Sequence, residues 1–66
     1  MRITVNGEAR ELADGTTVSA LIEQMGLAES ICAAEVNKSV VRRDARDAHQ
    51  LAEGDAVEIV TLVGGG

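Results

Sequence analysis

Alternating apolar and polar residues open the chain, with Ile3 and Val5 on one side of the alternation. A period of two residues is typical of a half-buried strand. Asn6-Gly7 follows this strand, and both residues tolerate the positive φ angles that the centre of a type I′ hairpin turn requires. The pattern therefore predicts a hairpin whose second strand covers residues 8–12, before Asp14-Gly15 ends it.

An amphipathic helix is predicted next. One apolar stripe recurs at positions i, i+3, i+4 and i+7, formed by Val18, Leu21, Ile22 and Met25. Thr16 or Thr17 is suited to cap the start of this helix, because a hydroxyl oxygen can accept from a free backbone N–H. Gly26 is suited to end it in a left-handed conformation, with Leu27 making the accompanying hydrophobic contact.

The second half of the chain has the pattern of strands. Cys32, Ala34 and Val36 alternate with more polar residues, which predicts a third strand. A turn at residues 37–39 leads to a short fourth strand at residues 40–41. The pattern weakens over residues 42–54, where Leu51 is the one clear core residue, and residues 53–55 then form a turn. Residues 56–63 form the last strand. One main helix packed on one face of a mixed sheet of four to five strands is an α+β arrangement.

The last strand has two unlike faces. If Glu58 marks the solvent side, Val60 and Leu62 also point outward, while Val57, Ile59 and Thr61 point at the helix. The chain has no second helix to cover the outward side, so we expect Glu58, Val60 and Leu62 to form a docking surface. The alternative is a central strand that is apolar on both faces.

The chain ends in Gly64-Gly65-Gly66, directly after this strand. Three extended residues reach roughly 10 Å beyond a fold. Glycine lets the backbone pass through a narrow channel, and the terminal carboxylate is ionised at neutral pH. We therefore expect a folded domain at residues 1–63 and a flexible tail at residues 64–66 that enters a partner's active site. The alternative is an ordinary frayed terminus.

Composition narrows the classes of function. The formal charge of −5 disfavours nucleic acid as a partner and favours a basic protein surface. A single cysteine fits a reducing cytoplasm, and no stretch approaches the ~20 apolar residues of a membrane span. A chain of 66 residues without Phe, Trp or Tyr has little room for a ligand pocket, which disfavours an enzyme.

The chain has one cysteine and one histidine, residue types that often have a catalytic or metal-binding role, but their positions do not favour such a role here. Cys32 occupies a core-facing strand position, where a thiol acts as a small hydrophobic group. His49 lies in an irregular polar segment, and its spacing to Asp44 and Asp47 matches no known metal loop. We therefore expect no catalytic residues and no metal site in this chain.

Four segments of the chain have a pattern found in a known family. They are the opening Ile3-Thr4-Val5-Asn6-Gly7-Glu8, the helix start Gly15-Thr16-Thr17-Val18, the strand end Val36-Asn37, and Gly54-Asp55-Ala56-Val57-Glu58-Ile59-Val60 leading to Val63-Gly64-Gly65-Gly66. On these segments the chain resembles, over its whole length, the ThiS family of sulfur carriers in thiamine biosynthesis, which have the ubiquitin-like β-grasp fold. The chain departs from the family at Lys38-Ser39, often Gly-Glu, and at residues 42–45, which lack the usual proline and aromatic residue.

The resemblance implies a carrier that holds no cofactor. An E1-like adenylyltransferase of the ThiF type would attach AMP to the Gly66 carboxylate, using ATP and Mg²⁺. Sulfur from a persulfide donor would then replace AMP to give a C-terminal thiocarboxylate. A thiazole synthase of the ThiG type would accept this sulfur for the thiazole ring of thiamine. In this scheme Gly64 and Gly65 give access to the partner's active site.

Two alternatives remain open from the sequence. The small subunit of molybdopterin synthase is a sister carrier with the same fold and tail. A β-grasp protein-binding module without carrier chemistry is the other alternative, with a glycine end of no function.

Overall fold

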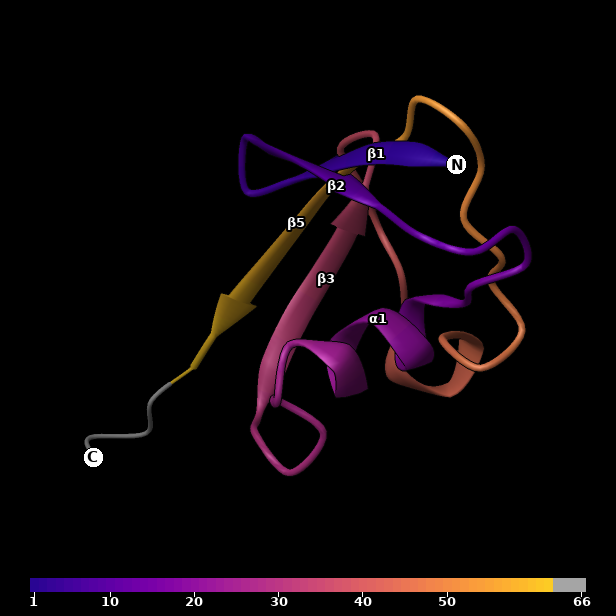
Figure 1. Cartoon of the computed structure of the whole chain (residues 1–66). Coiled ribbons are helices and arrows are strands. Elements are labelled where there is room, and N and C mark those ends of the chain that lie inside the picture. Colours follow the sequence, from indigo (N-terminus) through magenta and orange to yellow (C-terminus); the bar gives the residue numbers. More distant parts are fainter. Residues whose placement is uncertain (63–66) are drawn as a thin grey trace.

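The computed structural model describes residues 1–62, which form five strands, one α-helix and one short 3-10 helix (Figure 1). In chain order these elements are β1 (Arg2–Val5), β2 (Glu8–Glu11), α1 (Val18–Gln24), β3 (Cys32–Val36), β4 (Ser39–Val40), η1 (Arg43–Ala45) and β5 (Ala56–Thr61). The predicted tail at residues 64–66 lies outside the described residues, as does Val63. Neither helix within residues 1–62 is long and apolar enough to cross a bilayer.

The sheet has the strand order β2-β1-β5-β3-β4, so two strands from distant parts of the chain lie side by side. β1 and β5 are parallel, with Val5 opposite Val57, and all other neighbours are antiparallel. α1 lies on one face of this sheet (Figure 1). The predicted α+β class, with one main helix on a mixed sheet, is confirmed.

Both hairpins turn on residues with positive φ. Asn6 and Gly7 have φ of 52° and 84°, which fits the predicted type I′ turn between β1 and β2. Asn37 and Lys38 join β3 to β4 with φ of 52° and 70°. A lysine in the left-handed region is unfavourable because its Cβ approaches the following carbonyl oxygen, so this second turn carries local strain.

The helix begins and ends as its sequence predicts. The Thr17 side chain accepts a hydrogen bond of 3.1 Å from the Ala20 N–H. At the other end Gly26 has a φ of 76° and donates to the Glu23 carbonyl, and Leu27 donates to the Ile22 carbonyl. These two bonds form a Schellman motif, which supplies partners for carbonyls that the helix end leaves free.

The core lies between α1 and the sheet, and it is entirely apolar. Most core side chains come from the apolar sides of β1, β3 and β5 and from the apolar stripe of α1, and they include Cys32. The buried residues are Ile3, Val5, Leu12, Val18, Leu21, Ile22, Cys32, Ala34, Val36, Val41, Leu51, Val57 and Ile59. Met1, Met25 and Leu27 are partly buried against them.

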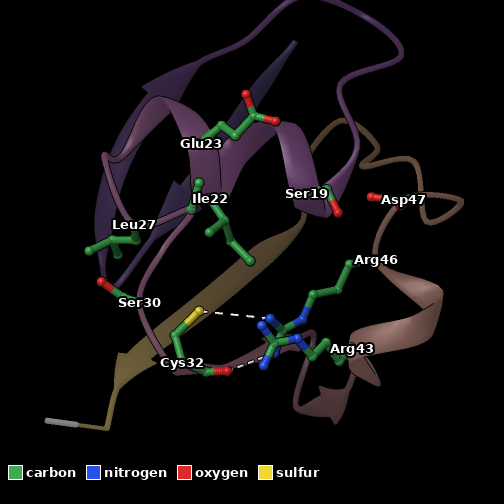
Figure 2. Close-up of a pocket in the computed structure, with 10 residues that line it drawn as sticks. Ser19, Ile22, Glu23, Leu27, Ser30, Cys32, Arg43, Arg46 and Asp47 are labelled. Carbon is green, nitrogen blue, oxygen red and sulfur yellow. Dashed lines mark hydrogen bonds between the residues drawn. The ribbon is translucent and has the colours of Figure 1, made fainter.

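Residues 42–50 have a role that their weak pattern did not predict. The Ser19 N–H donates to the Arg46 carbonyl, and the Val18 N–H donates to the His49 carbonyl. The segment thereby supplies acceptors for backbone N–H groups at the start of α1, which have no partner within the helix. Arg46 also donates to the Cys32 carbonyl at 2.7 Å, and its Nη1 lies 3.8 Å from the Cys32 Sγ (Figure 2). The segment thereby connects the helix to β3.

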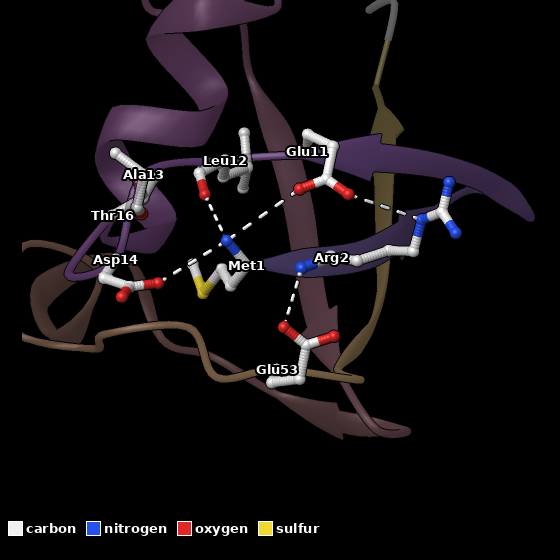
Figure 3. A network of polar contacts seen from close by, with 8 residues as sticks. All are labelled: Met1, Arg2, Glu11, Leu12, Ala13, Asp14, Thr16 and Glu53. Atoms are coloured by element: carbon white, nitrogen blue, oxygen red, sulfur yellow. Dashed lines mark hydrogen bonds and ion pairs between the residues drawn. The ribbon is translucent and has the colours of Figure 1, made fainter.

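The N-terminal ammonium is part of a polar network at the edge of the sheet (Figure 3). It donates to the Leu12 carbonyl at 2.7 Å and lies 3.4 Å from a carboxylate oxygen of Asp14. The neighbouring Arg2 backbone N–H donates to Glu53 at 2.9 Å. These contacts join β1 to the chain after β2 and to the turn before β5.

Candidate functional site

The candidate site is the face of the sheet opposite α1, where two of the predicted docking residues lie on β5 and the third, Leu62, directly follows it. Val57 and Ile59 are 1% and 5% exposed, whereas Val60 and Leu62 are each 55% exposed. Glu58 is also exposed. The predicted outward direction of Glu58, Val60 and Leu62 therefore agrees with the structure. Thr61 lies opposite the buried Cys32, so it is on the helix side of the sheet as predicted, although its side chain is exposed.

Two further apolar residues belong to this face. The Leu62 N–H donates to the Ile31 carbonyl at 2.8 Å, which continues the antiparallel pairing of β3 with β5. Val40 of β4 lies opposite Glu35 of β3. Ile31 and Val40 are 61% and 70% exposed, and with Val60 and Leu62 they are the exposed large hydrophobic residues of the described chain. We call these four residues the open-face patch.

Ile31 and Val40 were missed from the sequence. The alternation of Cys32, Ala34 and Val36 already places Ile31 on the outer face. That signal becomes useful only when the partner strand is known, because register decides which side chains of different strands become neighbours.

The acidic residues near β5 have different surroundings. The Asp55 carboxylate accepts from the Asn37 side chain at 3.0 Å and from the Ala52 N–H at 2.8 Å, so it stabilises the turn before β5. Glu53 binds the Arg2 backbone. Glu58 lies directly opposite Glu35 and has no ion pair within residues 1–62. Of these acids, Glu58 is the one whose charge stays available to a partner.

Two asparagine side chains hold β5 in place. The Asn6 amide bonds both the N–H and the carbonyl of Ile59, at 2.9 and 3.2 Å. The Asn37 side chain accepts from the Ala56 N–H at 2.9 Å. These bonds fix the strand from which the chain continues to residues 63–66. Gly64, Gly65 and Gly66 lie outside the described residues, so their predicted role stays a prediction.

Cys32 and His49 are not part of the open-face patch. Cys32 is 8% exposed and borders a cavity of about 290 Å³ between α1 and residues 43–47 (Figure 2). The backbone carbonyl of His49 caps α1, which is a structural role. Among residues 1–62, no three His, Cys, Asp or Glu side chains come close enough together to hold a metal ion.

Comparison with known proteins gives relatives of two kinds. The Escherichia coli sulfur carrier protein ThiS is 30% identical, and the match covers all of both chains. A thiazole synthase of Magnetococcus marinus is 41% identical over 66 residues, but this chain spans only 20% of its length.

A solved structure agrees with the fold. The crystal structure of the thiamine biosynthesis protein ThiS from Geobacter metallireducens has a TM-score of 0.84 and 35% identity, with full coverage of both chains. The family model of the ThiS family matches residues 3–66. By sequence over almost its whole length, and by structure, the chain belongs to the ThiS family.

Proposed function

We propose that the chain is a sulfur carrier protein of thiamine biosynthesis that carries sulfur as a C-terminal thiocarboxylate of Gly66. The observation that supports this most directly is the family match over residues 3–66, which includes the three terminal glycines. The E. coli relative, a sulfur carrier protein, points to the same function.

The chemistry requires activation of a poor acyl donor. An adenylyltransferase of the ThiF type attaches AMP to Gly66 and releases pyrophosphate from ATP. The terminal sulfur of a protein persulfide attacks the acyl-adenylate and displaces AMP, and a thiol then reduces the acyl disulfide to the thiocarboxylate. Glycine at positions 65 and 66 keeps the acyl carbon unhindered, since it has no Cβ. A thiazole synthase of the ThiG type receives the sulfur.

The thiamine pathway is favoured over the molybdopterin pathway by the thiazole synthase relative. Its match covers the full length of this chain, so a domain similar to this one occurs within a protein named for thiazole synthesis. The open face supports a carrier that docks on its enzymes, because Glu58 and Val60 lie on β5 and Leu62 follows directly after Thr61. The alternative of a β-grasp module without carrier chemistry predicts no need for a free carboxylate.

The decisive experiment blocks that carboxylate. We expect the protein with a C-terminal amide on Gly66, or with Gly66 deleted, to support no ATP–pyrophosphate exchange by a ThiF-type enzyme. Circular dichroism should show an unchanged fold, because β5 ends at Thr61. Undiminished exchange with the amide would refute the carrier function. Fragmentation mass spectrometry of protein from cells should place the extra sulfur on the last residue.

A further inference from the structure

A pair of like charges lies within the open face. Glu35 of β3 and Glu58 of β5 are directly opposite each other in the antiparallel register, so their side chains leave the same face of the sheet. Directly opposed residues have Cβ atoms about 4.5–5.5 Å apart, and like charges in such a pair destabilise a sheet. Neither carboxylate has an ion pair within residues 1–62.

The pair is bordered by apolar residues. Val40 lies opposite Glu35 on the β4 side, and Val60 follows Glu58 along the same face of β5, with Ala33 opposite it. A partner that covers the open-face patch therefore also removes water from the two carboxylates. Buried charges without a counter-charge are costly, so a partner with a purely apolar surface would bind poorly here.

The charges of Glu35 and Glu58 limit which partner can bind to the open face. A second copy of the chain would bring its own two glutamates and a net charge of −5 to the interface. A guanidinium group carries one positive charge on a planar fork of five N–H donors, which can bond two carboxylates at once. The complementary surface is therefore an apolar protein surface with an arginine at its centre.

We propose that Glu35 and Glu58 together bind one arginine of the adenylating enzyme, and that this contact orients the carrier while the open-face patch covers the enzyme's apolar surface. The inference depends on the proposed function and adds the chemistry of the partner. The repulsion between the two glutamates is then a cost in the free carrier that binding relieves.

The test compares Glu35→Gln and Glu58→Gln, singly and together, with the matched control Glu23→Gln. Glu23 is an exposed residue of α1, on the other side of the sheet. Affinity for a purified ThiF-type enzyme is measured by titration without ATP, and stability by thermal melting. Each of the two single variants is expected to bind about tenfold more weakly or worse, since it leaves the partner's charge less compensated.

Two further readouts separate this role from a structural one. Both single variants should melt at a higher temperature than the wild type, because one of two repelling charges is gone. The double variant should lose less affinity than the product of the two single losses, because both glutamates bind the same group. The Glu23→Gln control should change neither quantity.

A failure of the proposed arginine contact can be distinguished from a failure of the carrier function. At high carrier concentration, Glu35→Gln and Glu58→Gln should still support ATP–pyrophosphate exchange, because the Gly66 carboxylate is intact. Wild-type affinity in both variants would overturn the arginine contact and leave the carrier function standing. A loss of affinity together with a lower melting temperature would also overturn it, since the glutamates would then support the fold. Absence of exchange with the wild-type chain would instead refute the carrier function.

Discussion

The side chain of Asn6 takes the place of a strand next to Ile59, although the two residues are 53 positions apart. Its Oδ1 accepts from the Ile59 N–H at 2.9 Å, and its Nδ2 donates to the Ile59 carbonyl at 3.2 Å. β1 ends at Val5, which lies opposite Val57, so the strand stops two residues before it could pair with Ile59. The asparagine amide therefore completes the pairing of β5 on the side of β1.

Asn6→Gly should destabilise the fold by about 1–3 kcal/mol, the cost of leaving partly buried backbone groups without their partners. Glycine keeps the φ of 52° accessible, so this variant removes the side chain without adding strain to the turn. Urea denaturation followed by circular dichroism measures the effect. Asn6→Ala is the companion variant and should lose more, because alanine adds strain at positive φ. Equal stability of Asn6→Gly and the wild type would show that the two bonds contribute nothing.

Lys38→Gly should stabilise the protein by about 0.5–1 kcal/mol, because it relieves the strain of a lysine at a φ of 70°. Asn-Gly is also the preferred pair for a type I′ turn. The matched control is Ser39→Gly in β4, where no positive φ is present and glycine should weaken the strand. Chemical denaturation of both variants checks the difference in sign. Destabilisation by Lys38→Gly would contradict the turn geometry.

Substitution by aspartate should separate the two faces of β5. Val60→Asp or Leu62→Asp should leave the fold nearly as stable but weaken binding to the adenylating enzyme by about 1–3 kcal/mol, the range for residues central to an interface. Ile59→Asp should unfold the domain, since it places a charge in an apolar core. Thermal melts beside partner titrations test this order. An unfolded Val60→Asp beside a folded Ile59→Asp would reverse the assignment of the faces.

Cys32→Ser should keep thiocarboxylate formation, because the proposed sulfur site is Gly66 and the thiol is 8% exposed. We expect some loss of stability from a hydroxyl in a largely apolar site. Arg46, whose Nη1 lies 3.8 Å from Sγ, can donate to that hydroxyl and reduce the loss, so Cys32→Ala is the control without an acceptor. Mass spectrometry and thermal melting provide the two readouts. A folded Cys32→Ser that accepts AMP but never sulfur would show a reactive thiol.

Local patterns predicted the elements well, because each depends on near neighbours in sequence. The Thr17 cap, the Gly26 end of α1 and the Asn6-Gly7 turn are of this kind. The two faces of β5 also followed from alternation, with Glu58 as the marker of solvent.

Features that depend on register between distant segments were not predicted. The opposition of Glu35 and Glu58, and the place of Ile31 beside Leu62, require the pairing of β3 with β5. Residues 43–45 form a 3-10 helix that was not predicted. None of its three residues is buried, so the sequence shows no apolar stripe there. The hydrogen bond from Arg46 to Cys32 could not be predicted from hydrophobic periodicity either, because it joins two segments that are not neighbours in sequence.

The position of β5 between β1 and β3 has a consequence for how the domain folds and unfolds. Without β5, the sheet divides into the β1–β2 and β3–β4 hairpins, and an isolated two-stranded hairpin is marginally stable at best in water. No half of the sheet can therefore persist alone. We expect slow, all-or-none folding that waits for contacts between distant parts of the chain. The amide hydrogens of all three central strands should then exchange with one common free energy of opening. A protease that removes β5 would destroy the whole fold at once.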